Sequence, residues 1–364
     1  MIVSSLVIQK YYFVLRLRLS LKLFIWQVKE FLRRLFVKRR SVRFAARCYL
    51  AKINARKVRK DGERNRNGID SRLPQMNLNE IKNVLIVGLG LLGGSYAKAL
   101  TRNGFDVKVI TLNQDDIDYA MGEGFISGGT TEVDPELIAN SQLIIFALYP
   151  HTFIEWIEQY GNLIKPGTVI TDVTGVKGCI VEKVQNMLPG GVEFISAHPM
   201  AGKETCGVRS ADDSIFKKAN YIVVPTNRNT PDGIRLCCDL GRVLGFNDIS
   251  SLTVRQHDEM IAFLSQLTHG IAISLMCANG DPNLVRYTGD SFRDLTRIAN
   301  INDEMWSELF LANREALLLE MDGYREAFDR LYDTIKNNDR DAMRDMMKLS
   351  SARRKTFNEG EKLI

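Results

Sequence analysis

The sequence predicts an α/β domain with a doubly wound sheet, followed by a domain made only of helices. From Lys82 to about Phe246, strand-like apolar runs alternate with helix-like stretches, and after Phe246 long helical patterns continue almost without proline or glycine. With 364 residues, 45% of them hydrophobic, the chain is long enough for roughly two domains. We therefore expect a basic extension at 1–75, the α/β domain at 76–246 and the helical domain at 247–364.

The extension differs from the rest of the chain in charge. Residues 1–72 hold 20 Lys and Arg against 4 Asp and Glu, whereas residues 73–364 hold 29 against 39. The mildly acidic remainder predicts no nucleic-acid surface, and the absence of a long uninterrupted apolar run predicts no membrane span. We expect the extension to be disordered or loosely helical and to lie outside the fold.

Three interpretations of the extension remain open. It is a membrane-surface or targeting segment, a nucleic-acid-binding arm, or upstream sequence that is not part of the working protein. The third is preferred, because "KVRKDGERNRNGIDSRLPQ" has the composition of a solvated linker and Met76 stands just before the first strong strand.

The six cysteines are scattered along the chain. They form no CxxC pair and no His/Cys spacing suited to zinc. We assign no metal site, and unpaired cysteines favour a reducing, cytoplasmic location.

The first strand leads into a glycine-rich loop. In "NVLIVGLGLLGGSYAKALTRNG" a buried-type strand is followed by GxGxxG and then by a helix-like stretch. Gly88 permits a tight turn, Gly90 lets the backbone approach a pyrophosphate, and Gly93 allows close packing of helix and strand. The residues expected to contact the cofactor here are Gly88, Gly90, Leu91, Leu92 and Gly93. Together with its flanking strand and helix, the loop predicts a Rossmann-like dinucleotide-binding domain.

The second strand, "DVKVITLN", ends at Asn113, where an acidic residue would ordinarily bind the adenosine ribose. Asparagine can still bond a hydroxyl, but it does not repel a 2′-phosphate as a carboxylate does. The next residues are Gln114, Asp115 and Asp116, and no arginine follows to bind such a phosphate. We expect NAD as the cofactor, with NADP as the alternative.

Three more strand-like runs end in "ALYP", "DVTGVKG" and "AHPMAG". Ligands of doubly wound sheets bind beyond the carboxyl ends of the strands, so Tyr149, Thr174 and His198 are predicted to gather around one crevice. Tyr149 and Pro150 are expected to contact the cofactor there. The proline after His198 disfavours helix at that histidine and favours an extended segment. In isolation, a structural histidine is the simpler interpretation.

The helical part offers a polar stripe. In "HDEMIAFLSQLTHGIAISLMCAN", Asp258, Ala262, Ser265 and His269 fall on one helix face. This stripe lines a site or packs against another helix.

Farther along, "SFRDLTRIANINDEMW" places Arg293 and Arg297 one turn apart. An arginine there could bind a carboxylate bidentately or form an ordinary surface ion pair with Asp294. The last helices carry a wide apolar stripe that needs a partner, for which the same helices of a second subunit are suited.

These motifs carry a resemblance that covers about residues 82–364. In order they are "GLGLLGGS", "DVTGVKG", "SAHPMAGKE", "QHDEMIAFLSQLTH" and "FRDLTRIA...MW". The set resembles the prephenate dehydrogenase family, which includes arogenate and cyclohexadienyl dehydrogenases. The resemblance implies oxidation of prephenate to 4-hydroxyphenylpyruvate with loss of carbon dioxide, on the route to tyrosine, by a homodimeric enzyme.

The resemblance also implies roles for residues. The family's catalytic histidine falls on His198, its carboxylate-binding arginine on Arg297, and a second substrate-side histidine on His269. Glu204 and Asp258 match polar residues that organise the pocket.

One motif departs from the family. Many members have Asp-Val-Gly-Ser-Val-Lys where this chain has "DVTGVK", so the serine that commonly helps to hold the catalytic histidine is replaced by Gly175. Thr174 is the candidate for the missing hydroxyl.

Other functions were weighed. Prephenate is preferred over arogenate, from which it differs only in the side chain. An alternative of another class is a non-catalytic dinucleotide-binding redox sensor with the extension as its DNA arm, but His198, His269 and Arg297 indicate an occupied second site. A 6-phosphogluconate or 3-hydroxyisobutyrate type dehydrogenase would be expected to use a catalytic lysine, and "AHPMAG" argues against it.

Overall fold

The computed structural model describes residues 76–203 and 205–360, with side chains as far as 357. The predictions for residues 1–75 and for Glu204 lie outside the described residues.

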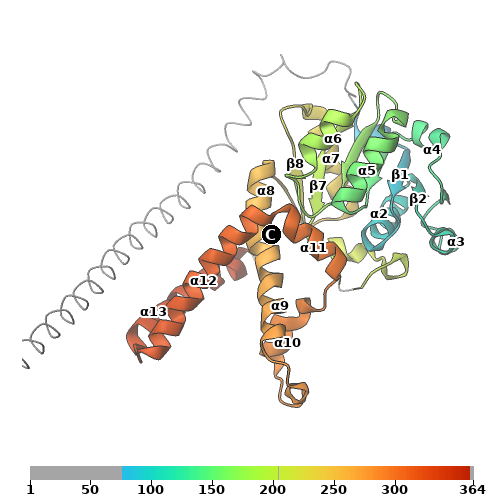
Figure 1. The fold of residues 1–364 in the computed structure, drawn as a ribbon. Helices are drawn as coiled ribbons and strands as arrows, with labels where there is room; N and C mark the ends of the chain where they lie inside the picture. The colour runs from blue at the N-terminus through green and yellow to red at the C-terminus, as the bar shows by residue number, and fades with distance from the viewer. Residues whose placement is uncertain (1–75, 204, 361–364) are drawn as a thin grey trace, which may run out of the picture. The chain divides into compact units, whose positions relative to one another are not determined.

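The α/β domain is built on a parallel sheet of six strands in the order β3-β2-β1-β4-β5-β6. Strands β1 and β2 lie side by side in this sheet (Figure 1). The strands are β1 (Asn83–Val87), β2 (Asp106–Ile110), β3 (Gly128–Thr130), β4 (Leu143–Phe146), β5 (Val169–Asp172) and β6 (Glu193–Phe194). The order reverses between β1 and β4, the place where doubly wound sheets bind their ligands. The predicted Rossmann-like fold is confirmed.

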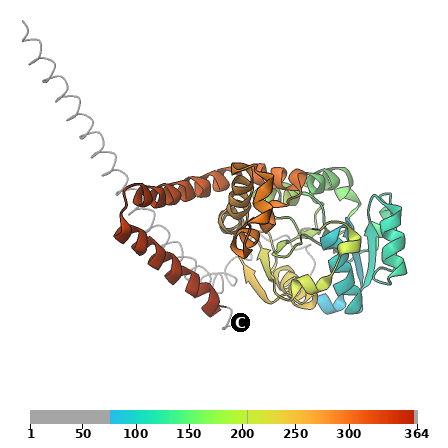
Figure 2. The same ribbon diagram turned by 90° about the horizontal axis from the view of Figure 1, so that it is seen from below.

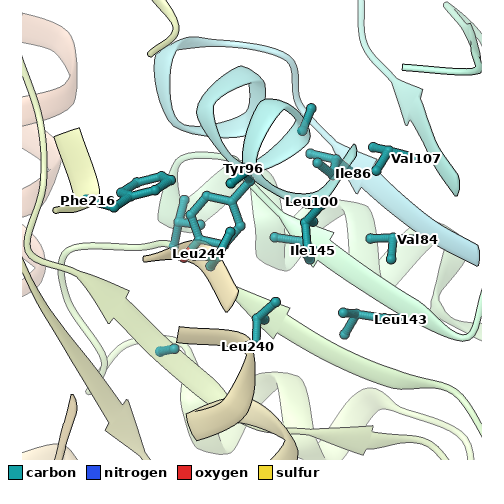
Figure 3. Packing of buried hydrophobic residues seen from close by; sticks show 14 of the residues in the cluster. Val84, Ile86, Tyr96, Leu100, Val107, Leu143, Ile145, Phe216, Leu240 and Leu244 are labelled. Atoms are coloured by element: carbon teal, nitrogen blue, oxygen red, sulfur yellow. The ribbon is translucent and has the colours of Figure 1, made fainter. Parts of the chain in front are cut away.

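Helices cover both faces of this sheet. They are α2 (Leu91–Arg102), α3 (Gln114–Gly122), α4 (Pro135–Ala139), α5 (Pro150–Tyr160), α6 (Val181–Met187) and α7 (Pro231–Leu244), with short helical turns η1 (Leu78–Glu80), η2 (Gly161–Leu163), η3 (Val208–Ser210) and η4 (Asp213–Phe216). Successive side chains of a strand point to opposite faces, so β1 contributes to two cores. Val84 and Ile86 pack with Tyr96 and Leu100 of α2 (Figure 3), whereas Leu85 packs on the opposite face.

A second, three-stranded sheet carries the histidine segment. It consists of β7 (Ser196–Pro199), β8 (Asn220–Val224) and β9 (Asp248–Ser251), with β7 antiparallel and β9 parallel to β8. The expectation of one strand through "GVEFISAHPMAG" is therefore wrong, because the chain changes sheet at Ile195. The backbone of Ile195 still bonds to β5, but Ser196 and Ala197 bond instead to the Asp172 side chain. β9 also extends the strands past residue 246, where the domain boundary was expected.

The rest of the described chain is helical, as predicted. It comprises α8 (Val254–Ile261), a π-helical segment η5 (Ala262–Leu267), α9 (Thr268–Ala278), η6 (Pro282–Arg286), α10 (Asp290–Thr296), η7 (Arg297–Ala299), α11 (Asp303–Ala312), α12 (Arg314–Lys336) and α13 (Arg340–Gly360). α12 and α13 form a helical hairpin (Figure 2). Among the described residues of α12 only Leu317 is buried. This hairpin therefore leaves most of its apolar side chains exposed.

Of the described residues, one continuous helix, Val254–Ala278, is long and apolar enough by length and composition alone to cross a membrane. Its first part bonds to the α/β domain through Asp258, and Ile261, Ala262 and Leu267 are buried. We interpret it as the central helix of the helical domain, interrupted by a π-helical turn of the kind often found at functional sites.

Candidate active site

The glycine loop between β1 and α2 has the shape that a dinucleotide needs. Gly88 has a φ of +98°, in the left-handed region that favours glycine. A Cβ on Gly93 would lie 2.0 Å from the carbonyl oxygen of Gly88, whereas a Cβ on Gly90 would meet nothing within 4 Å. The amides of the first turn of α2 have no partner within the helix and are suited to a pyrophosphate. The loop therefore fits the cofactor.

The other predicted cofactor residues follow neighbouring strands. Tyr149 and Pro150 begin α5 directly after β4, and the side chain of Asn302 donates to the Tyr149 hydroxyl at 3.4 Å. Asn113 caps α3, where its Oδ1 accepts the amide N–H of Asp115 at 2.9 Å. Its NH2 group thus remains for a ribose hydroxyl, and the cofactor contacts of these residues stay predictions.

A buried ion pair lies beneath the proposed catalytic histidine. Asp172 and Lys177 are fully buried, and Lys177 Nζ donates to Asp172 Oδ2 at 2.7 Å and to the carbonyl of Ala197 at 2.6 Å. The carboxylate also accepts the hydroxyl of Ser196 at 2.6 Å and the amide N–H of Thr174 at 2.9 Å. Burial lowers the pKa of Lys177, and the nearby Asp172 carboxylate opposes that shift. Both charges are surrounded by hydrogen-bond partners.

The hydroxyl of Thr174 belongs to this buried network. It contacts the Asp172 carboxylate and the carbonyl of Val176, and it accepts from Lys177 Nζ at 3.2 Å. The side chain is buried. The interpretation that Thr174 replaces the family serine beside the substrate therefore needs correction, because its hydroxyl is already bonded beneath the site.

Gly175 is the position that faces the histidine. A Cβ built there would lie 3.9 Å from His198 Nε2 and 3.5 Å from a terminal carbon of Leu309. A serine side chain would thus be adjacent to His198, and this chain has no side chain at that point. Leu309, on α11, is a neighbour that the sequence patterns did not indicate.

His198 is bonded to a second histidine. Its Nδ1 lies 2.8 Å from Nε2 of His257 on α8, whose own Nδ1 lies 2.7 Å from Asp258 Oδ1. The Asp258 carboxylate accepts the amide N–H groups of Lys177 at 2.9 Å and of Gly178 at 2.7 Å. Asp258 thus bonds to the backbone at Lys177 and Gly178 and to the ring of His257, and its role toward a substrate stays a prediction.

Burial favours the neutral form of both rings. The pKa of His198 lies well below its ordinary value of 6.5, chiefly through burial and then through His257 and the Lys177 ammonium. Burial also lowers the pKa of His257, although the contact with Asp258 opposes the shift. A neutral imidazole can accept a proton, as a general base must.

Side chains of helix α11 contact His269 and His151. Trp306 stacks on the ring of His269 with 3.7 Å between centroids. The carboxylate of Glu308 accepts the backbone N–H of His151 at 2.8 Å and contacts its Nδ1 at 2.6 Å, at the start of α5. Leu309 lies one turn after Trp306, so α11 places one side chain against His269 and another near Gly175. The "MW" of the last motif was the signal for Trp306.

The two arginines have different surroundings. Arg293 bonds to Asp290 at 3.3 Å and to the carbonyl of Thr288 at 3.1 Å on the surface of α10. Arg297 begins the short η7 turn, which packs against α9, the helix of His269.

Within the described residues no cluster of three or more His, Cys, Asp or Glu is arranged to hold a metal ion.

Two family models match successive segments of the described chain. The model of "Prephenate dehydrogenase, nucleotide-binding domain" matches residues 96–240, and that of "Prephenate dehydrogenase, dimerization domain" matches residues 253–349. The prephenate dehydrogenase of Bacillus subtilis is 26% identical over 270 residues, which span 72% of each chain. The cyclohexadienyl dehydrogenase of Zymomonas mobilis is 25% identical over 75% of this chain and 95% of its own.

Solved structures are similar over the same part of the chain. Prephenate dehydrogenase from A. aeolicus, in complex with hydroxyphenyl propionate and NAD+, has a TM-score of 0.70 and 27% identity over 76% of this chain and 98% of its own. Synechocystis arogenate dehydrogenase has a TM-score of 0.65 and 24% identity over 75% of this chain and 99% of its own.

Two glycine variants test the cofactor loop. Gly93→Ala is expected to destabilise the protein by about 1–3 kcal/mol and to weaken dinucleotide binding, because its Cβ clashes with the Gly88 carbonyl. Gly90→Ala is the matched control: it should leave the melting temperature unchanged but raise the dissociation constant roughly tenfold or more. Calorimetric titration measures the dinucleotide affinity of the two variants, and thermal unfolding measures their stability. Equal stability of the two variants would contradict the packing argument.

Removal of the buried ammonium tests the network beneath His198. Lys177→Met should lower the free energy of unfolding by about 3–5 kcal/mol, because it leaves the Asp172 carboxylate buried and uncompensated. Arg235→Met, which removes an exposed ion pair with Asp232 on α7, should cost less than about 1 kcal/mol. Urea denaturation measures the free energy of unfolding of both variants. Similar losses of stability in the two would refute a special role for the buried pair.

Proposed function

The chain belongs to the prephenate dehydrogenase family, and from that premise we propose that it converts prephenate to 4-hydroxyphenylpyruvate with transfer of a hydride to NAD+ and loss of carbon dioxide. It is an oxidoreductase of tyrosine biosynthesis that acts on a cyclohexadienyl substrate with a nicotinamide cofactor. The observation that carries the proposal is the chain of contacts from Asp258 through His257 to His198, whose Nε2 lies beside Gly175. The redox-sensor alternative predicts no such base.

The residues divide the chemistry between them. A bound nicotinamide dinucleotide supplies the hydride acceptor. We propose that Nε2 of His198 accepts the proton of the ring hydroxyl while the hydride leaves the ring carbon that bears this hydroxyl. Formation of an aromatic ring supplies the driving force, so the protein mainly has to position the substrate and remove this proton. General-base help of this kind is typically worth about 10² to 10⁴-fold.

Other groups are proposed to hold the substrate. Arg297 would bind a carboxylate, and His269, fixed against Trp306, would contact the substrate from the helical domain. Asp258 would act indirectly, by holding the loop at Lys177 and the ring of His257. The role of Glu204 rests on the resemblance alone.

Prephenate is proposed over arogenate because the prephenate dehydrogenases of Bacillus subtilis and Lactococcus lactis are among the most similar relatives, at 26% and 27% identity. NAD is proposed over NADP because the end of β2 presents Asn113 and then Asp115 and Asp116, whose carboxylates would repel a 2′-phosphate. Arogenate with either cofactor is the alternative.

We further propose a cytoplasmic homodimer formed through the last helices. Exposed apolar side chains run along the hairpin of α12 and α13 and include Leu318, Leu319, Phe328, Tyr332 and Ile335. An apolar stripe of this kind needs a partner, and the family's dimerization domain covers it. Analytical ultracentrifugation should give twice the chain mass.

The deciding experiment is a cofactor-reduction assay with prephenate and arogenate, each with NAD and NADP. The proposal expects the highest kcat/KM for prephenate with NAD. Preference for arogenate would replace the substrate assignment, and absence of reduction in all four assays would refute the enzyme assignment.

His198→Gln should lower kcat by about 10² to 10⁴-fold and leave the dissociation constant of the dinucleotide unchanged. In the native enzyme, kcat/KM should stay level as pH falls to 6.5 and decline only at lower pH, because the pKa of His198 is held below that value and the base must be unprotonated. Near-normal kcat in the variant, or a decline that begins above pH 6.5, would exclude His198 as the base.

Arg297→Ala should mainly raise KM for prephenate, by roughly 10 to 100-fold, because it removes a charge-assisted bond worth about 1.5–3 kcal/mol. Arg293→Ala is the matched control, since that arginine is bonded to Asp290 and Thr288 on the surface of α10. Initial-rate kinetics measure both, and equal KM values for the two variants would return Arg297 to a surface role.

A further inference from the structure

The direction of each proton between Asp258 and His198 follows from the hydrogen bonds. A carboxylate only accepts, and the Asp258 oxygens already accept two backbone amides. The contact of 2.7 Å between Asp258 Oδ1 and His257 Nδ1 therefore requires the proton to sit on Nδ1 of His257.

The next proton is then fixed as well. A neutral imidazole that donates through Nδ1 can only accept through Nε2. His257 Nε2 lies 2.8 Å from His198 Nδ1, a distance at which two nitrogens share one hydrogen, so His198 must donate through Nδ1. A neutral His198 consequently has a bare Nε2, on the side of Gly175.

We propose that His257 is a positioning residue that holds His198 in the tautomer with Nε2 unprotonated. This inference rests on the proposed function only in naming the proton that Nε2 receives. The sequence patterns did not indicate His257, and the serine that commonly helps to hold the catalytic histidine in this family is absent here.

The opposite tautomer is disfavoured by the same groups. It would place a lone pair of His257 Nδ1 against the Asp258 carboxylate, or it would need a cationic His257. The charged groups around the two rings are Asp258 on α8, with Lys177 and Asp172 beneath them. Burial and the Lys177 ammonium both disfavour the cation, so the lone pair that accepts the substrate proton is maintained at neutral pH.

Nuclear magnetic resonance can read this tautomer directly. The chain has 4 histidines, so the full-length protein labelled with ¹⁵N-histidine gives few ring signals, which single substitutions assign. Two-bond ¹H–¹⁵N spectra near neutral pH should show His198 and His257 each protonated at Nδ1 and bare at Nε2. His151→Gln, which removes an exposed histidine on α5, should leave the His198 pattern unchanged.

Two substitutions of His257 test the role in catalysis. His257→Phe removes the acceptor and should lower kcat roughly 10 to 100-fold, with an altered pH profile and an unchanged dinucleotide affinity. His257→Gln can still accept the Nδ1 proton through its amide oxygen, and it should recover most of the loss. A merely structural role predicts similar effects for both variants and no change in tautomer.

The outcomes separate this inference from the proposed function. A His198 protonated at Nε2 in the native spectrum would overturn the inference even if prephenate is oxidised. Absence of activity on both substrates, with the expected tautomer, would overturn the proposed function and leave the orientation of His198 standing. Because the native spectrum is decisive, failure of His257→Phe to fold does not weaken the test.

Discussion

The site depends on the buried Asp172–Lys177 ion pair. Desolvation of two charges is costly, and such a pair persists only where hydrogen bonds satisfy both partners, as they do here. Asp172 draws Ser196 and Ala197 away from the parallel sheet and so directs the strand that carries His198. Lys177 closes the loop whose amides hold Asp258. Both ends of the contact between His198 and His257 therefore depend on this pair.

Replacement of the family serine by Gly175 gives the second histidine its importance. A serine there would stand beside His198 Nε2, whereas His257 bonds to the opposite nitrogen of the ring. With no side chain at position 175, the ring of His198 forms its hydrogen bond, within the part of the chain that the structure describes, to Nε2 of His257. In the proposed mechanism the orientation of His198 is thus controlled from α8, and correct packing of α8 against the loop after β5 becomes a condition for catalysis.

The features that the sequence predicted are those with a local cause. The steric needs of the glycine loop follow from three positions, and Pro199 keeps His198 extended. The features that the sequence did not predict depend on contacts between residues far apart in the chain. Nothing local indicates that Asp172 splits the segment at Ile195, or that the Thr174 hydroxyl turns toward the same carboxylate. Helical periodicity indicated Asp258 but not His257. Periodicity shows which residues share a helix face, and it does not show that the ring of His257 contacts the side chain of the next residue.

The proposed base faces an electrostatic difficulty, because burial, the neighbouring His257 and the Lys177 ammonium all oppose a positive charge on His198. The same forces that keep the base ready make its protonated form unstable. A protonated His198 still donates through Nδ1 to a ring that is itself bonded to Asp258. The Asp258 carboxylate favours positive charge on His257, the ring it contacts. The carboxylate therefore acts on the second ring and not on His198 directly, and the hydrogen bond between the two rings is the link by which Asp258 influences the proposed base.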